Sequence, residues 1–214
     1  VVAGLEQAVE YLQNLTFTDS DIEYLKSLNT FSEKFFKKIK DFKFTGDVYA
    51  VREGEIVFPQ EPILIVKAPL SQAQLVETAL LTIINHQTLI ATKAYKVTQE
   101  TKGEVSEFGL RRAQGPGAGV YGSRASIIGG CTSTSNVLAG KLFDIPVSGT
   151  HSHSWIMSFD SELEAFEHYA KLYPTKCILL VDTYDTLRSG VPNAIKVFEK
   201  LRKQGYEPLG IRLD

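Results

Sequence analysis

Residues 104–142, EVSEFGLRRAQGPGAGVYGSRASIIGGCTSTSNVLAGKL, pass twice from a short strand pattern to a helix pattern. Glycines separate the two kinds of pattern, as is typical of the turns between such elements. The alternation continues to the end of the chain. Strands are predicted at Glu104–Phe108, Gly130–Thr132, Pro146–Ser148, Cys177–Asp182 and Pro208–Leu213, and helices at Gly117–Ile128, Val137–Leu142, Ser161–Tyr173 and Gly190–Gln204. Strands that alternate with helices predict a parallel α/β arrangement.

The residues before this region have a different texture. Short amphipathic helices are predicted over residues 1–43, and a long apolar helix from a capping-box pattern at Ser71 and Gln74 to about Val97. Between them lies a small β unit with strands at Gly46–Val51, Glu55–Phe58 and Ile63–Ala68. We therefore expect two parts: residues 1–102, part of an α+β domain with the long connecting helix, and residues 103–214, the first part of an α/β barrel.

Composition limits the possible functions. The chain has 214 residues, 43% of them hydrophobic, and a formal net charge of -2, so the charge balance does not predict a nucleic-acid groove. There is no apolar run of membrane-span length and no secretory leader pattern, and we expect a cytoplasmic protein with a small-molecule partner. Cys131 and Cys177 lie in apolar runs, where buried, reduced thiols are expected.

Both ends of the chain interrupt predicted elements. The chain starts at Val1 inside an apolar segment and stops at Asp214, at the tip of a strand pattern. Five strands cannot close an eight-stranded barrel. We expect a fragment of a longer polypeptide that is inactive alone.

Unusual polar residues follow the ends of the predicted strands, where a (β/α) barrel builds its active site. Phe108 could stack on a flat heteroaromatic ring while Arg111 holds a phosphate. Alternatively, Phe108 packs in the core and Arg111 is a solvated surface residue.

The segment Gly149–Ser154, GTHSHS, contains His151 and His153 two residues apart on an extended tip, where both should point the same way. A histidine there can be a nucleophile, a base or a metal ligand, and a polar loop with incidental histidines is the other interpretation. We expect His86 to be a satisfied core histidine and His168 a surface one.

Acidic residues come directly after the apolar run 177–181. A buried, unpaired Asp182 would be costly, so a cation, a histidine or a metal should lie opposite it. Asp185 could act in the same site or could cap the following helix.

Five motifs occur in order, one at each predicted strand end: EFGLRRAQGP, GGCTSTSNVLAG, GTHSHSW, VDTYDT and GIRLD. With them, and with the helix SQAQLVETALLTIINHQTLIAT, the chain resembles the nicotinate phosphoribosyltransferase family over its whole length. The resemblance implies an irregular (β/α) barrel of the type II phosphoribosyltransferases, preceded by a smaller α+β domain, in a homodimer with a shared active site. It implies that nicotinate, phosphoribosyl pyrophosphate, ATP and water give nicotinate mononucleotide, pyrophosphate, ADP and phosphate. This ligase or glycosyltransferase reaction is the first step of NAD salvage from nicotinate, with Mg²⁺ as cofactor and ATP as co-substrate.

The resemblance also assigns roles to residues. Phe108 matches the ring-stacking aromatic beside Gly109, and Arg111 the phosphate-binding arginine, while Thr134 and Ser135 lie where the carboxyl or amide of the substrate is read. His153 matches a phosphorylated histidine and Asp182 the acid that orients it. Gly149 and Thr150 precede that histidine as substrate-binding residues, and Arg212 and Asp214 match an Arg-x-Asp that contacts the base, the ribose and the phosphates. No metal-binding side chain is assigned.

Three other functions remain possible at this point. A nicotinamide phosphoribosyltransferase would have an acid at the position of Ser135, which would repel a carboxylate substrate, so Ser135 favours nicotinate. A metal-dependent barrel hydrolase could use His151 and His153, but it needs further histidines at later strand ends. The third is a non-enzymatic nucleotide-binding or scaffold role.

Overall fold

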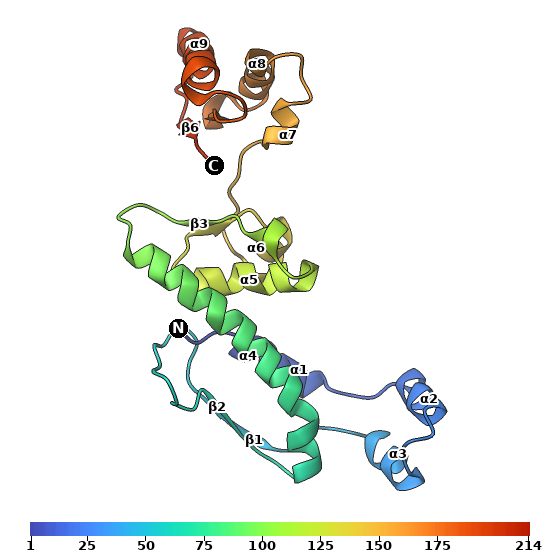
Figure 1. Cartoon of the computed structure of the whole chain (residues 1–214). Coiled ribbons are helices and arrows are strands. Elements are labelled where there is room, and N and C mark those ends of the chain that lie inside the picture. The colour runs from blue at the N-terminus through green and yellow to red at the C-terminus, as the bar shows by residue number, and fades with distance from the viewer. The chain divides into compact units, whose positions relative to one another are not determined.

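The computed structural model describes all 214 residues in two compact units, Val1–Ser148 and Gly149–Asp214 (Figure 1). Each unit has its own packed interior and is described by itself. The sequence predicts a different division, between an α+β part over residues 1–102 and a barrel part over residues 103–214, and this division stays a prediction.

The first unit is mainly helical. Its helices are α1 (Leu5–Asn14), α2 (Asp19–Ser27), α3 (Glu33–Ile39), α4 (Leu70–Gln99), α5 (Pro116–Ile128) and α6 (Val137–Phe143), with a short 3₁₀ helix η1 (Leu110–Arg112). Its strands are β1 (Asp47–Ala50), β2 (Leu64–Lys67), β3 (Ser106–Glu107) and β4 (Ser133–Thr134).

The long helix α4 organises this unit (Figure 1). Val76 and Leu80 on its first half pack with Ala8 and Leu12 of α1, and Ala91 on its second half packs with α5. The predicted helix is thus confirmed, but its predicted capping box is wrong. The N-cap is Pro69 and no side chain caps the helix, so Ser71 lies inside the first turn. Proline suits a helix start because it has no N–H that would need a partner there.

A β-hairpin covers the first half of α4. β1 and β2 pair antiparallel, with Asp47 opposite Lys67 and Ala50 opposite Leu64. The strand predicted at Glu55–Phe58 is wrong. The main chain there bonds to the start of the chain: Val2 N–H donates to Glu55 O at 2.9 Å, and Gly54 N–H donates to Val2 O at 2.9 Å. The connection therefore holds the residues before α1 and adds no third strand to the hairpin.

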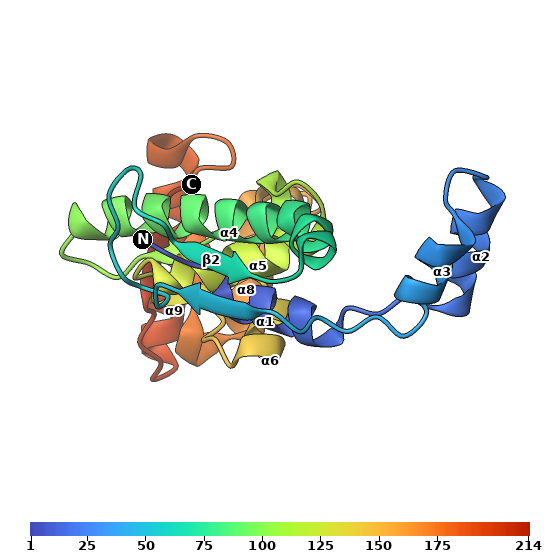
Figure 2. The ribbon, with the colours of Figure 1, turned by 90° about the horizontal axis from the view of Figure 1, so that it is seen from below.

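Helices α2 and α3 form a small pair that stands apart from α1 and α4 in both views (Figures 1 and 2). Thr18 and Asp21 make a reciprocal capping box at the start of α2, and Ser32 caps α3. The rings of Phe31 and Phe35 stack at 4.6 Å, and Lys26 of α2 lies over the ring of Phe36 of α3 at 5.6 Å. The stacked rings lie at the start of α3, and the cation–π contact links α2 to α3.

Short parallel strands lie beside α5. β3 pairs in parallel with β4, and Thr134 of β4 makes a further parallel bridge to Val147. The strand expected at Gly130–Thr132 begins later, at Ser133. The N–H groups of Gly130 and Cys131 still donate to the last carbonyls of α5, and Gly130 has a φ of 101°, so these residues end the helix.

The second unit repeats the strand and helix alternation. It contains α7 (His153–Ile156), α8 (Glu162–Leu172), η2 (Pro174–Lys176), β5 (Ile178–Leu180), the π-helix η3 (Thr186–Gly190), α9 (Val191–Lys203) and β6 (Gly210–Arg212). β5 and β6 are parallel neighbours, with Leu180 opposite Arg212. Phe166 of α8 and Val197 of α9 pack against Leu179 and Leu180 in a fully buried core. The strand predicted at Cys177–Asp182 is thus confirmed over Ile178–Leu180, and its apolar run is largely buried, as in other covered parallel strands.

The α/β fold class is confirmed, and the closure of the strands into an irregular barrel stays a prediction. Cys131 and Cys177 are buried free thiols, as expected. Burial raises the pKa of Cys177 to about 11, so this thiol stays protonated at neutral pH. None of the helices combines the length and the hydropathy that crossing a membrane requires.

Candidate functional site

The predicted site residues fall into two groups, one in each unit. Phe108, Gly109, Arg111, Thr134 and Ser135 belong to the first unit, and Gly149, Thr150, His153, Asp182, Arg212 and Asp214 belong to the second.

In the second unit the predicted histidine and acid contact each other. His153 is the first residue of α7, which Ser152 caps, and Asp182 follows β5. His153 Nε2 lies 3.1 Å from Asp182 Oδ1, so the pair that the resemblance implied is formed. A carboxylate can only accept, so the hydrogen bond places the imidazole proton on Nε2 and leaves the lone pair on Nδ1.

The end of β6 completes this group. Asp214 N–H donates to Asp182 Oδ2 at 2.8 Å, and Asp214 Oδ2 lies 3.3 Å from the Arg212 guanidinium. Arg212 Nη1 also donates to Thr150 Oγ1 at 3.0 Å. Because β5 and β6 are parallel neighbours, their carboxyl ends meet at one edge and bring these side chains together. Five of the predicted residues therefore form one polar network.

The hydrogen bonds of this network keep the Asp182 carboxyl ionised. Burial raises the pKa of the Asp182 carboxyl, but hydrogen bonds from the Asp214 amide and from His153 outweigh burial, so the pKa of Asp182 lies below its ordinary value. Asp182 is thus an anion at neutral pH. Asp214 Oδ2 lies 3.9 Å from His153 Nδ1, beyond hydrogen-bond length. Gly149, next to Thr150, is exposed, with no atom near a Cβ placed on it.

The prediction that His151 and His153 point the same way is wrong. α7 begins at His153 and ends the extended pattern, whereas His151 is buried and stacks edge-on to Tyr169 at 4.5 Å. Leu180 N–H approaches its Nε2 at 3.4 Å, while its buried Nδ1 has no protein partner. Burial, with smaller contributions from the charges of Arg212 and His153, lowers the pKa of His151 to about 4. His151 is therefore a neutral core residue.

A metal site built on these histidines is not formed. No three His, Cys, Asp or Glu side chains of the 214 residues are arranged to hold a metal ion. The hydrolase interpretation is not favoured, because the His151 ring is buried among aromatic rings.

Asp185 caps a helix, which is the second of the two roles predicted for it. Its carboxylate accepts the N–H groups of Leu187 and Arg188 at 3.1 Å and 2.8 Å and so caps the π-helix η3. Of the two acids in VDTYDT, only Asp182 contacts the histidine.

In the first unit, the ring candidate lies on the loop between β3 and η1, and the phosphate candidate lies in η1. Phe108 is half-buried, and Arg111 is exposed on η1. Ser135 follows β4 and its N–H donates to Glu107 O at 3.0 Å, so the two predicted segments are adjacent. The side chain of Thr134 is fully buried and donates to Glu107 Oε2 at 2.7 Å.

This loop borders a groove of about 880 Å³ between α4 and α5. Glu107, Gly109 and Leu110 line one side of the groove, and His86 and Tyr121 line the helices. His86 is half-buried and bonds to Ala118 O at 3.1 Å, so it is satisfied, but it lines the groove and is not the core residue that was expected. His168 is exposed, as expected. The groove gives the loop an open neighbouring volume large enough for a small molecule.

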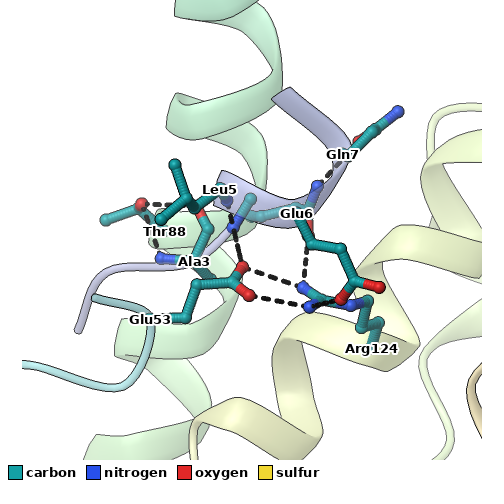
Figure 3. Close-up of polar contacts among 9 residues, drawn as sticks. Ala3, Leu5, Glu6, Gln7, Glu53, Thr88 and Arg124 are labelled. Atoms are coloured by element: carbon teal, nitrogen blue, oxygen red, sulfur yellow. Dashed lines mark hydrogen bonds and ion pairs between the residues drawn. The ribbon is translucent and has the colours of Figure 1, made fainter. Parts of the chain in front are cut away.

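A partly buried ion-pair network was missed by sequence reasoning (Figure 3). Arg124 of α5 makes two hydrogen bonds to the Glu53 carboxylate, at 2.8 Å and 2.7 Å, and a further one to Glu6. Glu53 also accepts the main-chain N–H groups of Gly4 and Leu5 at 2.6 Å and 3.1 Å. The network joins the start of α1, the hairpin and α5. An arginine within the small and apolar residues of α5 was the only signal for it.

Comparisons with known proteins agree with these observations. Residues 1–85 match the nicotinate phosphoribosyltransferase N-terminal domain model. The chain is 52% identical to nicotinate phosphoribosyltransferase of Bacillus subtilis, over 100% of this chain and 44% of that protein. The crystal structure of human nicotinic acid phosphoribosyltransferase superposes with a TM-score of 0.91 at 32% identity, over 100% of this chain and 53% of that chain.

A more distant structure shares the fold. Nicotinate-nucleotide pyrophosphorylase from Pyrococcus furiosus matches with a TM-score of 0.69 at 22% identity, over 100% of this chain and 56% of that chain. The chain spans about half the length of the curated relatives it matches. Matches to these relatives run along the whole length of the chain, which is therefore similar throughout to nicotinate phosphoribosyltransferases, in agreement with the order of motifs seen in the sequence.

Proposed function

We propose that this protein takes part in phosphoribosyl transfer to nicotinate, giving nicotinate mononucleotide and pyrophosphate, the first step of NAD salvage from nicotinate. The observation that carries the proposal is the contact between His153 and Asp182, held by the end of β6. A histidine with one nitrogen fixed by an anion and the other bearing a lone pair is equipped to act as a nucleophile.

ATP is the proposed partner of that histidine. Nδ1 of His153 attacks the γ-phosphorus of ATP, the bond from that phosphorus to the bridging oxygen breaks, and ADP leaves. Asp182 keeps the proton on Nε2 and stabilises the positive charge that the ring gains. Water later cleaves the N–P bond and releases phosphate. Arg212, which donates to Thr150, lies in the same network as a cation for phosphate oxygens.

The transfer step needs a different set of residues. The ring nitrogen of nicotinate attacks C1 of phosphoribosyl pyrophosphate, the bond to pyrophosphate breaks, and the transition state is oxocarbenium-like. Phe108 stacks on the ring and Arg111 holds a phosphate, while Ser135 leaves room for the nicotinate carboxylate without repulsion. Positioning and charge stabilisation do most of the work in such a step.

Magnesium is best treated as part of the phosphate-bearing substrates. Mg²⁺ is usually held by one or two carboxylates together with substrate phosphates, and none of the residues forms a ready-made metal cage. Asp214, a member of the His153 network, is the carboxylate that would accompany it. The ion would neutralise phosphate charge there. A homodimer with a shared active site and a cytoplasmic location belong to the same proposal.

Nicotinamide is the competing substrate, and one assay separates the two. Purified protein is incubated with phosphoribosyl pyrophosphate and either nicotinate or nicotinamide, with and without ATP, and the mononucleotide is measured by chromatography. The proposal predicts nicotinate mononucleotide, formed faster with ATP. Nicotinamide mononucleotide as the main product would contradict it.

A further inference from the structure

Glu107 occupies an unusual position at the end of β3. Both of its carboxylate oxygens are engaged: Oε1 accepts the N–H of Gly109, and Oε2 accepts the hydroxyls of Ser123 at 2.9 Å and of Thr134 at 2.7 Å. The side chain is half-buried and lines the groove beside α5. One carboxylate thus connects the loop after β3, the strand β4 and the helix α5.

We propose that Glu107 is a positioning residue, which fixes the loop that carries Phe108 and Arg111 and sets its distance from Ser135. This inference rests on the proposed function, because it concerns the segments assigned to the nicotinate ring and its carboxylate. Glu107 acts through its neighbours, since its two oxygens are already used inside the protein.

The loop is held at Gly109, which lies between the two candidate residues. Its N–H bonds to the Glu107 carboxylate, and its carbonyl accepts Arg112 N–H at 2.8 Å, the bond that closes η1. A Cβ on Gly109 would lie 3.0 Å from Glu107 Oε1. Arg111 therefore sits in a turn that is tied at its start by this carboxylate.

The main chain of Glu107 holds the second segment. Its carbonyl accepts Ser135 N–H at 3.0 Å, and Glu107 stands opposite Thr134 in the parallel register of β3 and β4. Asn136 N–H in turn donates to Thr134 Oγ1 at 3.0 Å, and Asn136 Nδ2 donates to Ser123 Oγ at 3.2 Å. Side chain and main chain of one residue therefore fix both predicted segments.

The network lies on one face of the strands, which allows a matched control. Ser106 and Ser133, the alternate residues, contact each other at 2.7 Å on the opposite face, and Ser133 contacts Ser148 there at 2.7 Å. Ser133→Ala removes buried hydroxyl contacts from the same pair of strands without touching the Glu107 carboxylate. Any general weakening of the strands should be common to both variants.

The carboxylate cannot be replaced by its amide without loss. Its two oxygens accept three donors, whereas glutamine has a single acceptor oxygen and would turn an NH₂ group toward one set of donors. An amide oxygen that keeps the Gly109 N–H bond loses the hydroxyl donors of Ser123 and Thr134, and one that keeps the hydroxyls loses Gly109. Because both hydroxyl oxygens already accept hydrogen bonds from Asn136, Glu107→Gln should weaken the link between the loop, β4 and α5 while keeping the size of the side chain.

The test compares Glu107→Gln, Gly109→Ala and Ser133→Ala with the unmodified protein. We expect Glu107→Gln and Gly109→Ala to raise the KM for nicotinate at least tenfold, while labelling of His153 by γ-labelled ATP changes less than twofold and Ser133→Ala keeps the original KM. Hydrogen–deuterium exchange should be faster at residues 108–112 in the first two variants only. Because exchange needs no turnover, it reports on the positioning role even if the protein does not use nicotinate.

Unchanged exchange in the loop of a folded Glu107→Gln variant, or an equal rise in KM in Ser133→Ala, would overturn the inference. If Glu107→Gln does not fold, the same two measurements on Gly109→Ala, the exchange at residues 108–112 and the KM for nicotinate, decide whether the inference holds.

Discussion

Nε2 of His153 lies 3.1 Å from Oδ1 of Asp182, and the second oxygen of that carboxylate accepts the main-chain N–H of Asp214 at 2.8 Å. The acid is thereby held between the histidine and the end of β6. Rotation of the carboxylate would break both bonds, so the orientation of the imidazole depends on the pairing of β5 with β6.

Asp182→Asn should impair phosphorylation of the histidine. If the amide oxygen keeps the Asp214 N–H, its NH₂ group faces Nε2 and moves the ring proton to Nδ1, the nitrogen that must attack. We expect the rate of phosphoenzyme formation from γ-labelled ATP to fall by roughly 10²–10⁴-fold, as for other histidines held in the wrong tautomer. Asp185→Asn is the matched control, because asparagine also caps helices and Asp185 does not contact His153. A normal rate in Asp182→Asn would show that the acid does not select the tautomer.

Ser135→Asp should weaken the use of nicotinate. A carboxylate placed beside the nicotinate carboxylate costs about 1–3 kcal/mol for a partly screened pair, which is a loss of about 5- to 150-fold in kcat/KM. Nicotinamide, which is neutral, should lose less. The check is kcat/KM for both substrates in the same variant, and an equal loss for both would mean that Ser135 does not read the carboxyl group.

His151 should make the protein less stable in acid. Its folded pKa of about 4 lies below the ordinary value of 6.5, so the unfolded chain binds more protons between these values. Stability is therefore full above about pH 6.5 and falls as the pH drops toward 4, by on the order of 3 kcal/mol at a cost of about 1.4 kcal/mol per pKa unit. His151→Gln keeps an acceptor for Leu180 N–H but cannot titrate, and it should flatten the stability curve in this range.

Urea unfolding at a series of pH values measures this effect. His168→Gln, which removes an exposed histidine from α8, is the control and should follow the unmodified protein. If His151→Gln shows the same loss of stability between pH 6.5 and 4, the acid sensitivity has another source.

The pair of Arg124 with Glu53 should contribute more to the free energy of unfolding than the more exposed pair of Arg124 with Glu6. The side chains of Arg124 and Glu53 are 12% and 19% exposed, whereas that of Glu6 is 68% exposed. Arg124→Ala leaves the Glu53 carboxylate without its buried counter-ion, and we expect a loss of about 3–5 kcal/mol in the free energy of unfolding. Glu6→Gln should cost less than about 1 kcal/mol, as for a surface pair. Equal effects of the two changes would contradict the assigned role of Glu53.

Local patterns predicted much of the fold. Helices α4, α5, α6, α8 and α9 lie close to the ranges predicted for them. In α9 the reason is a clear apolar face, because Ala194, Val197 and Leu201 are buried at helical spacing. The strand at Glu55–Phe58 could not be excluded locally, since the main-chain partner of Glu55 is Val2, far away in the sequence. The capping box at Ser71 failed for a similar reason, because Pro69 starts the helix earlier.

The candidate site was predicted less evenly. Motif order led to His153 and Asp182, and the parallel pairing of β5 with β6 then brought Arg212 and Asp214 to them. The burial of His151 could not be read from its spacing, because it depends on the aromatic rings of α7 and α8. Glu107 was passed over as an ordinary polar residue of the motif, since its partners come from three separate segments.

The central claim is that His153 is the residue that receives phosphate from ATP. The most direct measurement is acid-labile, base-stable radiolabel on the intact protein after incubation with γ-labelled ATP, followed by peptide mapping. We predict label on His153, and in His153→Ala neither label nor ATP hydrolysis, but a slower ATP-independent formation of nicotinate mononucleotide. Undiminished label in His153→Ala, or label on His151, would contradict the account.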